Sequence, residues 1–122
     1  MSDTVGSKFA NRLQSATYQN DTQVHFGIAP SQRTPESWVT VSERVVARLT
    51  SMGMAYELHH IQMIDIYDDT TFKSQQCEKL YRELEFLAGV IKDPVLGEVL
   101  NTLAALIKPA LGKPLHLMVS GN

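Results

Sequence analysis

The residues best suited to chemistry are histidines and aspartates, which together could hold a divalent metal ion. They are His25, His59, His60, His116, Asp65, Asp68 and Asp69. Consecutive residues of a strand point to opposite faces, so His59 and His60 would share an ion only if a bulge re-aimed one of them. The chain has no H-x-H, H-E-x-x-H or Cys/His spacing. A metal-dependent enzyme is therefore kept only as an alternative, and neither a metal nor a cofactor is predicted.

Other catalytic patterns are also missing from the sequence. The spacing Asp65-x-x-Asp68-Asp69 lacks the glycine and the final glutamate of a calcium-binding EF-hand loop. Cys77 lies on an apolar stripe between Phe72 and Leu80, which is typical of a small core residue rather than a nucleophile. The chain has no G-x-S-x-G, no S-x-x-K and no glycine-rich phosphate loop. We predict that it is not an enzyme and has no catalytic residues.

The distribution of charge favours a protein partner. The net charge is −2, but the 24 residues between Arg48 and Lys73 contain no lysine or arginine and carry four acidic residues. This stretch has a charge of −4, so the rest of the chain has +2. A surface that binds phosphates would need the opposite sign. Nucleic acid is therefore not an expected ligand.

The composition is that of one globular domain. The chain has 122 residues, of which 43% are hydrophobic and 20% charged, enough for one core but not for two. No apolar run approaches the roughly 18 residues that span a bilayer, and the first residues do not resemble a secretory signal. The single cysteine cannot form an internal disulfide. We expect a cytoplasmic protein with no membrane partner, in which a single α+β domain (22–122) follows an arm or short helix (1–21).

Hydrophobic periodicity predicts the elements of the N-terminal half. Val24, Phe26 and Ile28 alternate with other residues, which indicates a strand that Pro30 closes. Thr34-Pro35 has the form of a helix start, so a helix is predicted over 35–52, with Trp38 as a core anchor and Gly53 at its end. Residues 55–66 have no helical stripe and are predicted to form a long strand. A bulge near His59-His60, or burial on both faces, would explain its irregular alternation.

The C-terminal half contains the clearest helical patterns. Asp69 or Thr70 is predicted to cap a helix whose apolar stripe runs from Phe72 to Ile91. Asp93-Pro94 starts a second helix, over 94–107, and residues 115–119 alternate as a last strand. We expect an α+β fold: a small, mainly antiparallel sheet of three to four strands with three helices packed on it.

The passage from Asp65 to Gln76 has the form D-x-Y-x-D-T-x-F-x-x-x-Q and continues with Leu80, Glu83, Leu84 and Leu87. It resembles a group of short bacterial proteins similar to the immunity proteins of polymorphic toxin systems. The match covers about 25 residues, a fifth of the chain. The ending 115–122 is similar to the short strand and Gly-Asp finish of those proteins, with Asn122 in place of the acid. The resemblance implies a small cytoplasmic domain that binds a cognate toxin and blocks its active site, and it brings no catalytic residues.

The acidic stretch and the resemblance agree on an inhibitor of a cationic toxin site, because complementary charge speeds association and excludes wrong partners. The candidate partner-binding residues are Asp65, Tyr67, Asp68 and Asp69, with Glu57, His59 and His60 on the adjoining strand. Tyr67 would be an apt anchor beside the charges. A homodimeric assembly or a small-ligand-binding module remains an alternative, because the helix over 94–107 is more apolar than a surface helix requires.

Overall fold

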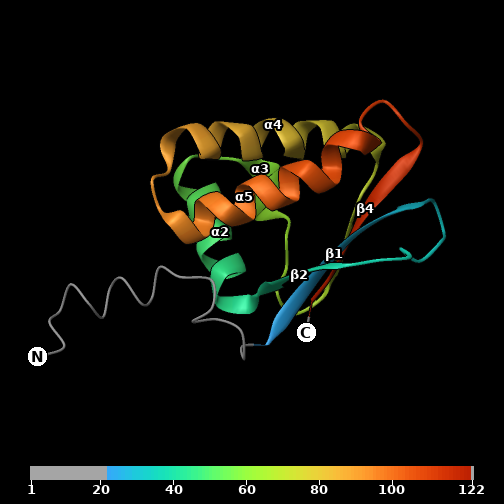
Figure 1. Ribbon diagram of the computed structural model, residues 1–122, viewed down its shortest axis with the longest axis horizontal. Coiled ribbons are helices and arrows are strands. Elements are labelled where there is room, and N and C mark those ends of the chain that lie inside the picture. The colour runs from blue at the N-terminus through green and yellow to red at the C-terminus, as the bar shows by residue number, and fades with distance from the viewer. Residues whose placement is uncertain (1–21, 122) are drawn as a thin grey trace, which may run out of the picture.

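The structure is a computed structural model that describes residues 22–121. The predicted arm or short helix over 1–21 lies outside the described residues, as does Asn122. The strands are β1 (Gln23–Pro30), β2 (Val39–Ser42), β3 (Asp69–Phe72) and β4 (Leu115–Ser120). The helices are α2 (Glu43–Ala55), α3 (His59–Gln62), α4 (Ser74–Val90) and α5 (Pro94–Ile107), and the 3₁₀ turn η2 (Lys108–Ala110) follows α5. This arrangement confirms the predicted α+β class (Figure 1).

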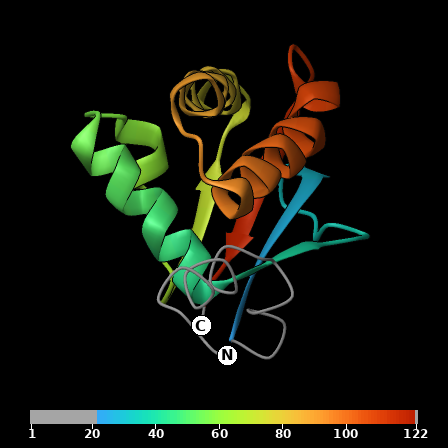
Figure 2. The same cartoon turned by 60° about the vertical axis from the view of Figure 1, so that its left-hand side comes forward.

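The four strands form one antiparallel sheet in the order β2-β1-β4-β3. Val24 and Phe26 of β1 are buried, as are Leu117 and Val119 of β4. Alternate residues of a strand point to opposite faces, so these side chains share the face on which the helices pack (Figure 2). The other face is called the helix-free face below.

One hydrophobic core joins the sheet to the helical layer. The largest of its fully buried side chains include Phe26, Leu49, Ile61, Phe72, Leu84, Leu100 and Leu117. Full burial of one such side chain contributes about 1.5–3 kcal/mol. The apolar character of α5 is largely accounted for here, because five of its residues are buried in this core. None of the helices in residues 22–121 is long and apolar enough to cross a membrane.

The helix predicted over 35–52 is wrong in its first part. Residues 39–42 form strand β2, which pairs with β1 through Val24 and Val41, and α2 begins only at Glu43. The β-branched residues of this segment suit an edge strand, and pairing with β1 outweighs the local helix-start signal. Trp38 precedes β2 and is 38% exposed, so it is not the core anchor that was predicted.

The long strand predicted over 55–66 is also wrong. The chain turns at Glu57, where φ is 58°, and then forms the one-turn helix α3. Ile61 and Ile64 are buried three residues apart, which is the spacing of a helical turn rather than of a strand. No bulge at His59-His60 is needed, because the irregular alternation arises from this turn.

Of the two predicted helix caps, the one for α4 is wrong and the one for α5 is confirmed. Asp69 and Thr70 do not cap α4, because both lie in β3, where they pair with Ser120 and Val119 of β4. The helix begins at Ser74, and the Gln76 side chain accepts a hydrogen bond from the Lys73 N–H at 2.9 Å. The predicted start of α5 is confirmed. Asp93 Oδ1 accepts hydrogen bonds from Val95 N at 2.9 Å and Leu96 N at 3.2 Å.

Candidate functional site

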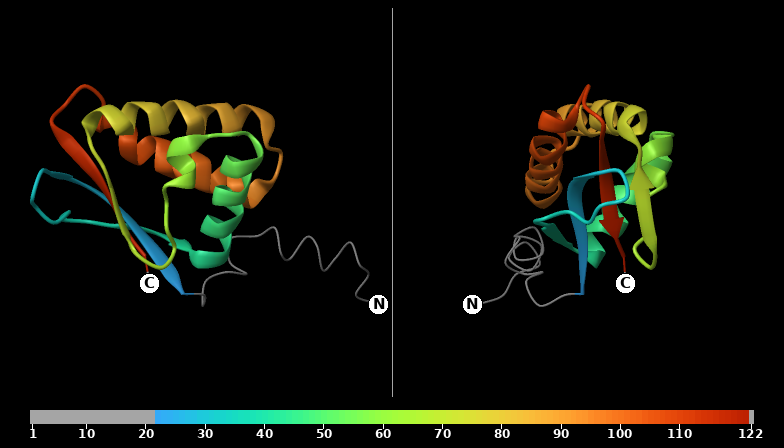
Figure 3. Two further views of the ribbon diagram at one scale, coloured as in Figure 1. Left: turned by 180° about the vertical axis from the view of Figure 1, so that it is seen from behind. Right: turned by 90° about the vertical axis from the view of Figure 1, so that its right-hand side faces the viewer.

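Residues 65–69 form an exposed turn that leads into β3, which we call the acidic loop. Asp65, Asp68 and Asp69 are exposed, and the Tyr67 side chain is 71% exposed. Figure 3 shows the segment after α3 running along the molecule to the end where the C-terminus lies, before it returns through β3 to α4. Four of the predicted partner-binding residues are therefore together on one exposed turn.

Short local hydrogen bonds give the acidic loop its shape. Asp65 Oδ1 accepts the Tyr67 N–H at 2.8 Å, and Asp68 Oδ1 accepts the Asp69 N–H at 2.8 Å. The first of these closes an Asx turn. The Gly121 N–H, just after β4, donates to the Asp68 carbonyl oxygen at 3.1 Å. The loop is thus attached to the end of the sheet rather than standing alone.

The charges of the acidic loop are not neutralised by the described part of the chain. The carboxylates of Asp65, Asp68 and Asp69 form no ion pair with any residue between 22 and 121. Three negative charges therefore lie within five residues, beside an exposed tyrosine. This surface can attract a cationic group and offer an aromatic ring to it.

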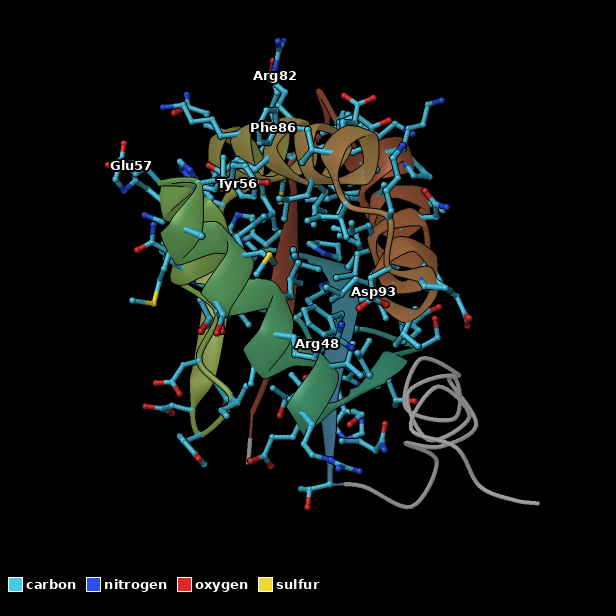
Figure 4. All side chains as sticks on the ribbon, turned by 90° about the vertical axis from the view of Figure 1, so that its left-hand side faces the viewer. Arg48, Tyr56, Glu57, Arg82, Phe86 and Asp93 are labelled. Atoms are coloured by element: carbon cyan, nitrogen blue, oxygen red, sulfur yellow. The ribbon has the colours of Figure 1, made fainter. Side chains whose placement is uncertain are left out.

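The remaining predicted residues belong to another part of the molecule. Glu57 lies in the turn between α2 and α3, which Figure 4 places on the side of the molecule where α4 lies. His59 and His60 lie in α3 rather than on an adjoining strand. His60 is half-buried, and its Nδ1 lies 2.9 Å from Glu83 Oε2 of α4. His60 therefore has an internal partner, whereas Glu57 and His59 are exposed.

Glu83 explains why His60 is held in this position. Its Oε1 accepts the backbone N–H groups of His60 at 3.1 Å and Ile61 at 2.9 Å. These are N–H groups at the start of α3, which have no partner inside the helix. The histidine ring and the helix start thus share one carboxylate.

The histidines do not form a metal site in the described range. Between residues 22 and 121, no group of three or more His, Cys, Asp or Glu side chains could hold a metal ion. His25 lies on β1, His116 on β4, and the other two on α3. His25 and His116 therefore lie in the sheet, and His59 and His60 lie in a short helix outside it.

Two of the hollows in the described part of the chain are of interest, and the sequence does not predict them. One, of about 220 Å³, lies on the helix-free face and is lined by Trp38, Asp69 and Ser120 among others. The second, of about 660 Å³, lies between α2 and the junction of α4 with α5. The sequence does not predict the first hollow, because its local patterns favour a helix at Trp38 and a helix cap at Asp69. The one sequence signal for this smaller hollow is the alternation of β4, which turns Met118 and Ser120 away from the core.

The larger hollow has mostly apolar walls and a charged rim. Met52, Val90 and Leu96 are among its lining residues. Arg48 and Asp93, labelled in Figure 4, form an ion pair at its rim.

Beyond this hollow, the exposed rings of Tyr56 and Phe86 meet edge to face, with centroids 5.5 Å apart (Figure 4). This end of the helical layer therefore exposes two aromatic rings to solvent in addition to its charged side chains.

Comparison with known proteins identifies no relative of this chain. No protein-family model, no curated protein and no solved structure matches it. The function therefore has to be inferred from the geometry of the chain itself.

Proposed function

We propose that this chain is a non-catalytic protein-binding domain that binds a positively charged partner through the acidic loop. The observation that carries the proposal is the group of three exposed carboxylates around Tyr67, which have no ion pair among residues 22–121. Complementary charge raises the association rate and rejects wrong partners. An exposed tyrosine at the centre of the charges suits an interface anchor, because tyrosine is enriched among the residues that dominate binding energy.

The local structure supports a binding role for the acidic loop. Its backbone is held by Asp65 and Gly121, so ordering the loop on binding costs less entropy than ordering a free segment. Tyr67 contributes little to the packing of the domain, because most of its side chain is exposed. A residue of this size is a candidate for contact with another molecule.

The resemblance of residues 65–76 to immunity proteins suggests the class of the partner. In this role the chain is a cytoplasmic protein that binds a cognate bacterial toxin with a cationic active site, such as that of a nuclease, and blocks it. Phe72 and Gln76 of the shared pattern have structural roles here, in the core and at the start of α4. Asp65, Tyr67 and Asp68 remain exposed for contact with the toxin.

Co-expression with the product of the neighbouring gene tests this proposal. Growth protection by the wild-type chain is compared with that of a Tyr67→Ala/Asp68→Lys variant, which removes the anchor and reverses one charge. We expect protection to be lost and the affinity of the purified pair to fall by at least about 100-fold, since about 1.4 kcal/mol corresponds to each factor of ten.

A matched control changes charge at the other end of the molecule. Glu57→Lys/Glu85→Lys alters two exposed carboxylates near α4 and should still protect. Circular dichroism verifies that both variants fold. If the acidic-loop variant is folded and protects, or if only the control variant fails, the acidic loop is not the binding surface.

A small-ligand-binding module is the second candidate, favoured by the hollow of about 660 Å³. Its size falls within the roughly 300–1,000 Å³ of ligand pockets. Apolar walls with Lys92 at the rim, where Asp93 pairs with Arg48, suit an amphipathic anion. Decanoate is a suitable probe. A saturable rise of the melting temperature that is abolished by Ser51→Trp, a change at an exposed lining residue, would support this function, and an unchanged melting temperature would exclude decanoate-like ligands.

A further inference from the structure

The hollow of about 220 Å³ on the helix-free face lies where the acidic loop enters β3. The lining side chains that matter here are Thr34, Trp38, Asp69, Thr71, Met118 and Ser120. The loop between β1 and β2 folds over this face of the sheet, because a Cβ added at Gly27 would lie 2.6 Å from Pro35 Cβ. This close approach brings Thr34 and Trp38, from the first half of the chain, next to β3 and β4 (Figure 3).

Strand register brings the polar lining residues together. Asp69 of β3 is opposite Ser120 of β4, and Thr71 is opposite Met118. Leu117 and Val119 are buried on the helix side, so Met118 and Ser120 point to the helix-free face. Directly opposed side chains on one face of an antiparallel pair have Cβ atoms about 4.5–5.5 Å apart. The hollow therefore combines a carboxylate, hydroxyl groups and an apolar thioether.

Trp38 contributes an aromatic wall. Its indole ring meets the His25 ring edge to face, at a centroid distance of 6.3 Å and an interplanar angle of 73°. Part of the Trp38 ring is accessible, since the residue is 38% exposed. The Asp69 carboxylate beside it has no hydrogen-bond or ion-pair partner within residues 22–121. A partly exposed indole and an unpaired carboxylate thus line the same small hollow.

We propose that this hollow receives the guanidinium group of an arginine side chain from the partner protein. The proposal rests on the proposed function, because the acidic loop brings a positively charged protein to this face. A guanidinium is planar, carries five N–H donors, stacks on aromatic rings and pairs with carboxylates through two parallel hydrogen bonds. Asp69 accepts two of these bonds, the hydroxyls of Thr71 and Ser120 accept others, and Trp38 stacks on the plane.

Other occupants fit this hollow less well. An ammonium group is compact, strongly hydrated and cannot stack as a plane on Trp38. An anion would be repelled by Asp69 and by Asp68 next to it. An apolar group would leave the carboxylate and the hydroxyls without partners, at a cost of about 1–3 kcal/mol for each group left unsatisfied. The combination of groups therefore selects a guanidinium.

The chain has a single tryptophan, so its indole N–H gives one NMR signal that reports on this hollow. The full chain is titrated with N-acetyl-arginine-methylamide, with the citrulline derivative of the same shape but no charge, and with the lysine derivative. We expect a saturable shift of the indole signal with the arginine derivative. Binding of the citrulline and lysine derivatives should be weaker by about tenfold or more, which corresponds to 1.4 kcal/mol or more.

Asp69→Asn and Asp68→Asn form a matched pair, because each removes one charge but only Asp69 lines the hollow. Asp69→Asn should weaken binding of the arginine derivative by about tenfold, and Asp68→Asn by much less. An indole signal that does not move with arginine would overturn the proposal. So would equal shifts with citrulline or lysine, or equal losses in the two variants.

The two proposals can fail separately. The Tyr67→Ala/Asp68→Lys variant changes no side chain that lines the hollow, so its growth assay tests the acidic loop alone. If that variant loses protection and the indole signal does not shift with the arginine derivative, the arginine site is wrong and the protein-binding function stands. If the arginine derivative binds but the variant still protects, the acidic loop is not the surface that binds the partner.

Discussion

Gly121 lies against the backbone of the acidic loop, at the end of β4. A Cβ added at this position would lie 2.5 Å from the Asp68 carbonyl oxygen and 2.6 Å from that of Asp65. Both are backbone atoms, which cannot swing aside as the end of a flexible side chain can. The absence of a side chain at residue 121 therefore sets how closely the acidic loop packs on the sheet.

Gly121→Ala should push the acidic loop away from β4. Crowding of this kind typically costs about 1–3 kcal/mol, and the amide NMR signals of residues 65–69 should shift. Gly97→Ala is the control, because a Cβ there meets nothing within 4 Å. In the interior of α5 it should raise the free energy of unfolding by about 0.5–1 kcal/mol. Unchanged loop signals in Gly121→Ala would show that the contact does not position the loop.

Cys77 is a buried thiol whose Sγ donates a hydrogen bond to the Phe72 carbonyl at 3.3 Å. Burial raises the pKa of this thiol above its ordinary value of 9.0. The unfolded thiol therefore loses its proton at a lower pH than the folded one. The free energy of unfolding should fall as the pH rises from the unfolded pKa towards the folded pKa.

Urea unfolding of the wild type and of Cys77→Ala, measured between pH 8 and 10.5, isolates this effect. The stability advantage of the wild type should shrink as the pH rises through this range, because the alanine variant has no thiol to ionise. A difference between the two proteins that stays constant with pH would contradict the raised pKa.

At the scale of elements, α3 depends on a side chain from α4. A helix of four residues is too short to be stable alone. Glu83 supplies acceptors for two of its first N–H groups and for the His60 ring. The turn between α2 and α3 is thereby fastened to the helical layer.

Glu83→Ala should reduce the free energy of unfolding by about 1–2 kcal/mol, the usual cost of a lost helix cap. The amides of His60 and Ile61 should also exchange with solvent faster. Glu85→Ala, which removes an exposed carboxylate from the same helix, should change stability by less than about 0.5 kcal/mol. Equal effects of the two variants would mean that Glu83 does not cap α3.

Asp93 caps α5 and also pairs with Arg48 of α2. The two roles can be separated, because asparagine caps a helix about as well as aspartate but carries no charge. Asp93→Ala should cost about 1–2 kcal/mol. Asp93→Asn should cost less than Asp93→Ala, because it keeps the cap and loses only the ion pair, whose Arg48 and Asp93 side chains are 37% and 15% exposed. Equal losses in urea unfolding would show that the ion pair, not the cap, stabilises this junction.

At the scale of the whole molecule, one core cluster includes residues from every strand and from helices α2 to α5. Within residues 22–121, neither layer has a second core on which it could remain folded. The sheet and the helices should therefore unfold together, as small single domains do.

Urea unfolding followed by two probes tests this. Trp38 fluorescence reports on the sheet, because this side chain contacts His25 of β1, and far-ultraviolet circular dichroism reports mainly on the helices. The two midpoints should coincide, with a slope of about 1–3 kcal/mol per molar urea. Separate midpoints would mean that one layer unfolds before the other.

Much of the fold was predictable because its signals are local. The alternation in β1 and β4, the apolar stripes of α4 and α5, and the Asp93-Pro94 start depend on neighbouring residues only. These elements were recognised, and the α+β class followed from them. The exposed charges of the acidic loop could also be anticipated, because a run of residues without lysine or arginine is visible in the chain itself.

The tertiary structure alone decided the rest, and the physical reason is that the deciding contacts join distant segments. Residues 39–42 became a strand because β1 offers an edge to pair with, and residues 59–62 became a helical turn because Glu83 caps it and Ile61 enters the core. Folding placed Glu57 in the turn before α3 and His59 and His60 in α3, and it brought Trp38 and Asp69 to the same hollow. Side chains 31 positions apart in the sequence become neighbours only when the sheet assembles.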